Sequence, residues 1–103
     1  MSLVQLESFV AVAEEGHVGR AAQRLHLSQP PLSRRIHALE DELGVELFER
    51  TSRGMALRPE GKALLPRARE ILARVDQVRE LAAQFAGKSN PAPASFDTPE
   101  RIE

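Results

Sequence analysis

A glutamine and an arginine near the start of one predicted helix have side chains suited to hydrogen-bonding the edges of nucleic-acid bases. The amide of Gln29 can pair with N6 and N7 of adenine, and the guanidinium of Arg34 can bond O6 and N7 of guanine. Ser33 can serve a base edge or a phosphate, and Pro30 offers a rigid apolar surface for a thymine methyl group. On an isolated helix face such residues are ordinarily solvated surface. The elements that position them therefore decide the interpretation.

The helix that must carry these side chains is predicted to begin with Ser28 as its N-cap. Leu27 and Leu32 flank that position with the spacing of a hydrophobic staple. The prolines at 30–31 fall in the first turn, where backbone N–H groups have no intrahelical partner to lose. Free backbone N–H groups at a helix start attract phosphate. Because Ser28 lies at this start, it is included among the predicted DNA contacts. Gly44 closes the helix, and its predicted buried residues are Leu32, Ile36, Leu39 and Leu43.

Two helices are predicted before it. Ser2 and Gln5 have the spacing of a capping box, and apolar residues then recur at helical spacing to about Glu15, where Gly16 ends the first helix. The second covers about residues 19–25.

Residues 18–37 together have the layout of a helix-turn-helix. Ala22 lies where two helices approach closely, and Leu32 and Ile36 would pack the second helix on the first. His26 occupies the turn, and histidine is among the residues that tolerate a left-handed backbone.

A small hairpin, or wing, is predicted at about residues 47–58. The segments 47–50 and 55–58 have strand-like character, and residues 51–54 suit a turn with a glycine at positive φ. An arginine in such a wing can follow the DNA backbone or enter a narrow minor groove. Arg53, at the tip, is the favoured contact. Arg50 is a second, with pairing to a nearby acid as an equal alternative.

A long helix is predicted over residues 59–86, with Pro59 at its first position and a bend at Pro66. Apolar residues recur along it at spacings of 4, 3, 4, 3, 4 and 3, which is typical of a coiled-coil seam. The members of this apolar seam are Leu64, Ala68, Ile71, Val75, Val78, Ala82 and Phe85.

The apolar seam could pack back onto its own domain or against a second chain. A helix of this length extends about 40 Å, which exceeds the width of so small a domain. Part of the seam would then stay wet unless another copy covered it, so a homodimer is expected. Two-fold symmetry then predicts an inverted-repeat DNA site.

The charge is segregated along the chain. The net charge is -1, which by itself argues against a nucleic-acid partner. Residues 16–39 carry only the positive charges of Arg20, Arg24, Arg34 and Arg35, whereas residues 40–49 hold five acids and no base. Arg35 is predicted to lie at the flank of the helix, where it contacts phosphate or only water.

Catalysis, cofactors, metals and membranes are not expected. The chain has no cysteine and three scattered histidines, and it shows no phosphate loop, no carboxylate pair in an apolar pocket and no metal-ligand spacing. Because these site materials are missing, the protein is not expected to be an enzyme. No apolar stretch approaches the roughly 20 residues that span a bilayer, so a cytoplasmic location is expected. Residues 87–103, which turn to Gly, Pro, Ser, Asn and Asp with little periodicity, are interpreted as a flexible linker or tail.

A set of short segments carries a family resemblance. They are FVAVAEEG at 9–16, Ala21-Ala22, Leu25, LSQPPLSR at 27–34, LE at 39–40, LG at 43–44 and LFER at 47–50. Over about residues 3–86 the sequence resembles the DNA-binding part of the LysR-type transcriptional regulators. The fold class expected is mainly α, with three helices and a short two-stranded wing at 1–58, followed by the long dimerisation helix.

The resemblance also implies partners. Such regulators bind double-stranded DNA as dimers, or as tetramers at full length, and carry a small-molecule effector domain behind the linker helix. That domain is absent here, so the chain is expected to be a piece of a longer regulator. Two departures stand out: Gly19 where Ser or Thr is frequent, and Arg58 where Thr usually caps the linker helix.

A winged-helix module that binds proteins and assembles through its coiled coil is the alternative function. The acidic block at 40–49 favours it. The polar set Gln29, Ser33 and Arg34 favours DNA.

Overall fold

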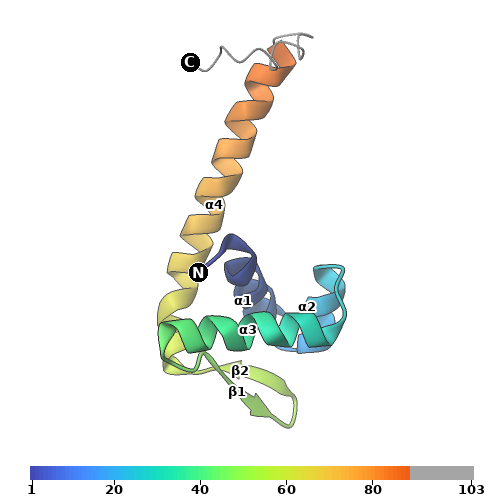
Figure 1. The fold of residues 1–103 in the computed structure, drawn as a ribbon, viewed down its shortest axis with the longest axis vertical. Helices are drawn as coiled ribbons and strands as arrows, with labels where there is room; N and C mark the ends of the chain where they lie inside the picture. Colours follow the sequence, from blue (N-terminus) through green and yellow to red (C-terminus); the bar gives the residue numbers. More distant parts are fainter. Residues whose placement is uncertain (89–103) are drawn as a thin grey trace. The chain divides into compact units, whose positions relative to one another are not determined.

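The computed structural model describes residues 1–88, so the predicted tail lies outside the described residues apart from its first two positions. The chain divides into two compact units, Met1–Leu72 and the residues from Ala73 onward. The elements, in chain order, are α1 (Leu3–Glu15), α2 (Val18–Arg24), α3 (Gln29–Leu43), β1 (Phe48–Thr51), β2 (Gly54–Leu57) and α4 (Pro59–Lys88) (Figure 1).

The start and end of α1 follow from its terminal residues. The backbone N–H of Gln5 donates to the Ser2 hydroxyl at 3.1 Å, and the Ser2 N–H donates to the Gln5 side chain at 3.0 Å. Gly16 ends the helix at φ 67°, and its N–H donates to the carbonyl of Val12 at 2.8 Å. The predicted capping box and the left-handed glycine are both confirmed.

The turn between α2 and α3 is held by backbone hydrogen bonds. The N–H of Leu25 donates to Ala21 at 3.0 Å, and that of Leu27 donates to Ala22 at 2.8 Å. His26 adopts the left-handed conformation with φ 60°, as predicted for this position. The chain can therefore reverse tightly enough for α3 to pack across α1 and α2.

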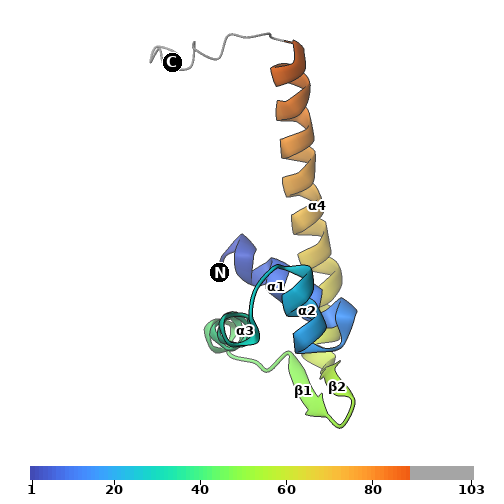
Figure 2. The same ribbon diagram turned by 90° about the vertical axis from the view of Figure 1, so that its right-hand side faces the viewer.

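α3 spans the first unit, with α1 above it and the β1–β2 hairpin below it in both views (Figures 1 and 2). Its residues Leu32, Ile36 and Leu39 are buried in the core as predicted. Leu43 was expected to complete this stripe, but 37% of it is exposed. It lines an apolar groove beside Leu64 on the surface instead of the core, because the helix ends at this residue and the chain turns at Gly44.

The β1–β2 hairpin, called the wing below, lies within its predicted range of 47–58, but both strands extend one residue closer to the tip than predicted. Phe48 pairs with Leu57 and Thr51 pairs with Gly54, so the turn has two residues rather than four. The Thr51 hydroxyl donates to the carbonyl of Gly54 at 3.2 Å and accepts the N–H of Arg53 at 3.2 Å. These bonds extend the pairing to the tip, and Gly54 provides the predicted positive φ of 139°.

The core of the first unit joins the three helices to the wing. The rings of Phe9 and Phe48 meet edge to face, with centroids 5.6 Å apart. The other buried apolar residues are Leu6, Val10, Ala11, Val12, Ala21, Ala22, Leu32, Ile36, Leu39, Leu47 and Ala68.

One member of the predicted apolar seam belongs to this core. Ala68 is only 3% exposed, and Leu65 and Leu72, three and four positions away, pack against the core as well. The first half of α4 thus packs this face against its own domain. The prediction that Ala68 is a dimerisation residue is therefore wrong, because its side chain is already buried in the core. Leu64, Ile71, Val78, Ala82 and Phe85 are exposed, and Val75 is half-buried.

Candidate nucleic-acid interface

The predicted base-contacting residues lie together on the first turns of α3. Gln29, Pro30 and Arg34 are exposed, and Ser33 is half-buried. Within residues 1–88, the side chains of Gln29, Ser33 and Arg34 make no hydrogen bond or ion pair. Polar side chains without a protein partner are hydrated, so their donors and acceptors remain available to a ligand.

Ser28 is the N-cap of α3, as predicted, but its side chain makes no capping hydrogen bond. An N-cap oxygen accepts from the backbone N–H of the second or third helical residue. In α3 those residues are Pro30 and Pro31, which have no N–H. The helix start therefore offers fewer N–H groups to a phosphate than the sequence-based expectation assumed. Ser28 is exposed, and its hydroxyl has no hydrogen bond within residues 1–88.

The wing carries two further predicted contacts, Arg50 and Arg53. Both are exposed, and Arg53 lies in the two-residue turn at the tip. In the described part of the chain neither guanidinium forms an ion pair. The acid next to Arg50 pairs elsewhere, since Glu49 lies 3.6 Å from Arg58. The alternative role for Arg50, pairing with the acidic block, is therefore not observed.

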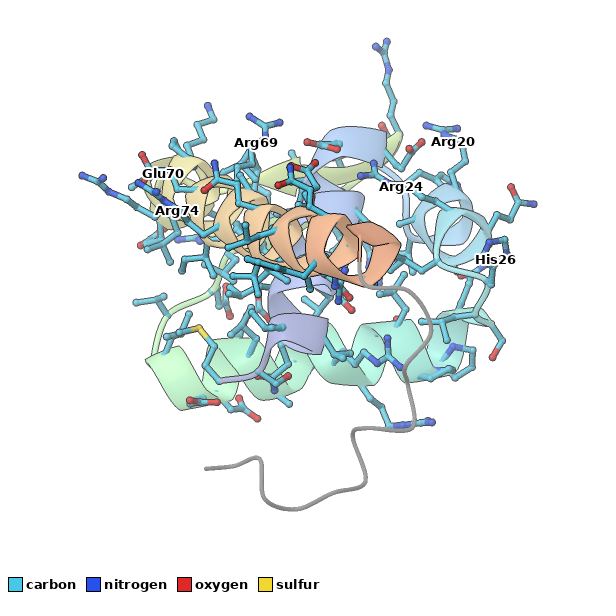
Figure 3. All side chains as sticks on the ribbon, turned by 90° about the horizontal axis from the view of Figure 1, so that it is seen from above. Arg20, Arg24, His26, Arg69, Glu70 and Arg74 are labelled. Carbon is cyan, nitrogen blue, oxygen red and sulfur yellow. The ribbon has the colours of Figure 1, made fainter. Side chains whose placement is uncertain are left out.

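The four arginines of the positive segment do not contribute equally. Arg24 pairs with Glu14 at 2.8 Å and with Glu15 at 3.3 Å. Arg20 donates to the carbonyl of Glu15 at 3.1 Å, and both project from one side of α2 (Figure 3). Arg34 and Arg35 have no such partner among residues 1–88. Of these four arginines, the two without a partner in the described residues are therefore those of α3.

Glu14 connects three helices through its carboxylate. Besides Arg24 of α2, it accepts from Arg69 of α4, whose nearest nitrogen lies 2.9 Å away (Arg69 is labelled in Figure 3). The hydrogen bond from Arg24 lowers the pKa of Glu14, against an opposing effect of burial and with help from Arg69. The same carboxylate raises the pKa of Arg24. This network supports the framework behind α3 rather than a ligand.

Sequence reasoning missed His17, which lies beside the candidate base contacts. Its Nδ1 accepts the backbone N–H of Arg20 at 3.2 Å and so caps α2. A Cβ placed on Gly19 would lie 2.8 Å from the ring Cε1 of His17 and 3.2 Å from the amide nitrogen of Gln29. Position 19 therefore has no room for a larger side chain unless His17 or Gln29 moves. The sequence signal that could have identified His17 as an N-cap was a polar residue directly before a short helix.

Residues 1–88 have neither a metal-binding cluster nor a membrane-spanning helix. They contain no group of three or more His, Cys, Asp or Glu side chains placed to hold a metal ion. In that same range, every helix is too short or too polar to cross a bilayer.

Three helices, a tight turn between the second and third, and a two-stranded wing define a winged helix-turn-helix domain. The family described as "Bacterial regulatory helix-turn-helix protein, lysR family" matches residues 3–62. The chain belongs to this family.

Named relatives agree with this assignment. The HTH-type transcriptional regulator TfdS of Cupriavidus pinatubonensis is 61% identical over 72 residues, which cover 70% of this chain and 24% of the relative. ClcR of Pseudomonas putida, also an HTH-type transcriptional regulator, is 53% identical over 85 residues, covering 81% of this chain and 29% of the relative. The chain thus spans about a quarter of the length of these two regulators.

Solved structures share the fold. A complex of the CbnR DNA-binding domain with DNA matches with a TM-score of 0.75 and 45% identity, covering 82% of this chain and 97% of that one. The BenM DNA-binding domain in complex with benA site 1 DNA matches with a TM-score of 0.78 and 43% identity, covering 86% and 100%. The predicted family and the predicted winged helix-turn-helix are confirmed.

Proposed function

We propose that this domain binds double-stranded DNA at specific sequences, with α3 in the major groove. The observation that carries the proposal is a set of polar side chains on the first turns of α3, together with the wing arginines, none of which has a hydrogen-bond or ion-pair partner for its side chain within residues 1–88. Two relatives of similar fold have been solved with DNA bound, which supports the same use of this domain.

The side chains divide into two roles. Gln29 and Arg34 are the base-contacting candidates, with Ser33 and Pro30 beside them, because amide and guanidinium groups can each bond two atoms of one base. Contacts to the phosphate backbone would come from four residues, which orient the domain without selecting a sequence. These are Ser28, Arg35, Arg50 and Arg53.

The domain is proposed to act as a homodimer through α4. The seam residues Val78 and Phe85 are 67% and 66% exposed, although both are large and apolar. In the first unit, Leu64 and Ile71 line an apolar groove that also includes Leu43. A second copy of α4 is the partner that coiled-coil spacing favours, and it would bring two α3 helices to an inverted repeat.

The function of the whole protein is proposed from its relatives. The named relatives are transcriptional regulators and the chain spans about a quarter of their length, so we infer that it is the DNA-binding part of a longer regulator. Control of transcription, tetramer formation, a small-molecule effector and a cytoplasmic location belong to that longer protein. No enzymatic activity is proposed.

Equilibrium binding to duplex DNA over a range of salt concentrations tests the proposal. A promoter-derived duplex should bind more tightly than a scrambled duplex of equal length. Its affinity should fall with salt by about 0.9 logarithmic units per tenfold increase for each phosphate neutralised. Absence of binding to any such duplex at low salt would contradict the proposal and favour a protein-interaction module.

A further inference from the structure

Glu40 of α3 connects the α3 helix to the wing through its carboxylate. Its Oε2 accepts the backbone N–H of Leu47 at 2.8 Å and that of Phe48 at 3.4 Å. Its Oε1 lies 3.6 Å from Nδ1 of His37, one turn earlier in the helix. The side chain is only 13% exposed, although glutamate is rarely buried without a partner. One acidic group therefore satisfies two successive donors at the base of β1.

The bonded amides belong to residues that fix the wing. Leu47 is fully buried and Phe48, which begins β1, is 5% exposed. The other strand is held separately, because the N–H of Met55 donates to the carbonyl of Gly16 at 3.1 Å. The wing thus has one polar attachment to α3 and another to the connection between α1 and α2.

We propose that Glu40 is a positioning residue for DNA binding, which sets the wing arginines at the right distance from the base-contacting face of α3. The inference rests on the proposed function, since it concerns two parts of the same interface. A phosphate contact by Arg53 needs the wing to be held while α3 lies in the groove. Without the carboxylate, two donors at the base of β1 lose their acceptor and the strand can shift.

Charge alone makes the opposite prediction for this residue. Glu40 is one of five acids between residues 40 and 49, and removing an acid from a DNA-binding domain should increase its affinity for a polyanion. Asp41 is the matched control. It is the next residue of α3, it is exposed, and it has no hydrogen bond or ion pair within residues 1–88. Both positions can lose one negative charge with almost no change in size.

The test compares Glu40→Gln with Asp41→Asn in equilibrium binding to one cognate duplex. Asp41→Asn should bind as tightly as the unaltered chain or more tightly. Glu40→Gln should bind several-fold less tightly, because a neutral amide oxygen is a weaker acceptor for two amides. The slope of affinity against salt should fall by about one phosphate contact in Glu40→Gln and should not fall in Asp41→Asn.

A double-mutant comparison separates positioning from general weakening. Adding Arg53→Ala should reduce affinity in the unaltered chain and have little further effect in Glu40→Gln. Adding Arg34→Ala should cost the same factor in both backgrounds. If Glu40 only stabilised the fold, Glu40→Gln would either reduce the effects of Arg53→Ala and Arg34→Ala on affinity together or leave both unchanged.

A second variant keeps the charge constant and guards against a folding defect. Glu40→Asp retains the carboxylate but shortens its reach by one methylene, so it should also lose the Arg53 effect. Hydrogen exchange at the amides of Leu47 and Phe48 should accelerate in both Glu40 variants. Tighter binding by Glu40→Gln, matching Asp41→Asn, with an undiminished Arg53 effect would overturn the inference. Failure of the unaltered chain to bind DNA would instead overturn the proposed function.

Discussion

The guanidinium of Arg24 lies 2.8 Å from the carboxylate of Glu14, so an ion pair joins α2 to α1. Arg69 extends it, with its guanidinium 2.9 Å from the other oxygen of the same carboxylate. The three side chains are between 32% and 52% exposed, which limits what each pair contributes to stability because solvent screens the charges. The network still fixes the short α2, and α2 supports the tight turn into α3.

Replacing Glu14→Gln should reduce the free energy of unfolding at neutral pH by about 1 kcal/mol or less, the range of partly exposed pairs. The pKa of Glu14 is lowered in the folded state, first by its hydrogen bond from Arg24. A lowered pKa means that the stabilisation is complete above the unfolded pKa, near 4.5, and is lost as pH falls through the folded value.

Denaturant melts of Glu14→Gln between neutral and acidic pH measure this effect. The difference from the unaltered chain should shrink below about pH 4.5 as the carboxylate is protonated. Glu7→Gln, also on α1, is the control, because Glu7 has no hydrogen bond or ion pair within residues 1–88. A difference that stays constant down to low pH would exclude an ionic origin.

Gly61→Ala should destabilise the domain although alanine is the better helix former. Gly61 is buried in α4, where an added Cβ would overlap the carbonyl oxygen of Leu47 and lie 2.7 Å from Cδ2 of Leu57. Helix propensity favours alanine by about 1 kcal/mol, whereas overpacking costs about 1–3 kcal/mol. Thermal unfolding should show a lower Tm. The same change at Gly87 meets no atom within 4 Å and should cause no loss, so equal effects at both positions would contradict the packing explanation.

Arg34→Ala and Arg53→Ala should affect DNA binding in different ways. Loss of a bidentate contact to guanine should cost about 1–3 kcal/mol and relax the base preference at one position of each half-site. Loss of a wing contact to phosphate should weaken binding to all sequences and lower the salt slope by about one. Binding to a panel of single-base variants of one site distinguishes the two, and unchanged affinity in both variants would remove these residues from the interface.

Val78→Glu should dissociate the proposed dimer. Val78 is 67% exposed, and a buried carboxylate at a seam position would lack a partner. Gln77→Glu introduces the same group one position away, outside the seam, and should leave the dimer intact. Sedimentation velocity reports the oligomeric state of both. If Val78→Glu remains as dimeric as Gln77→Glu, the seam does not form the interface.

Local signals in the sequence were sufficient for most of the fold. The capping box at Ser2 and Gln5 and the glycines after α1 and α3 are decided by neighbours in the chain, and they were predicted correctly. The helix-turn-helix, with His26 in a left-handed conformation, is confirmed for the same reason. The family was also identified from short segments, and the match over residues 3–62 confirms it.

The errors arose where tertiary contacts decide. Ala68 matched the seam spacing, but the periodicity of one helix cannot tell a core face from a partner face where the two overlap. The wing was predicted with a four-residue turn, whereas its strands continue to Thr51 and Gly54, because the Thr51 hydroxyl bonds to residues at the tip. The side chain of Ser28 makes no cap because the helix places prolines where the donors should be.

The site was only partly accessible from the sequence. Residue type and helix position led to Gln29, Ser33 and Arg34, and their roles in DNA binding stay predictions. Glu40 appeared as one acid among five, because its hydrogen bonds reach residues seven and eight positions later in the chain. No spacing rule for helices or strands connects such positions.

The most direct test of sequence-specific DNA binding is selection of bound sites from a random duplex library with this chain. The account predicts enrichment of two similar half-sites arranged as an inverted repeat, and loss of one conserved base in each half-site with Arg34→Ala. Recovery of sequences no different from the starting library would contradict it.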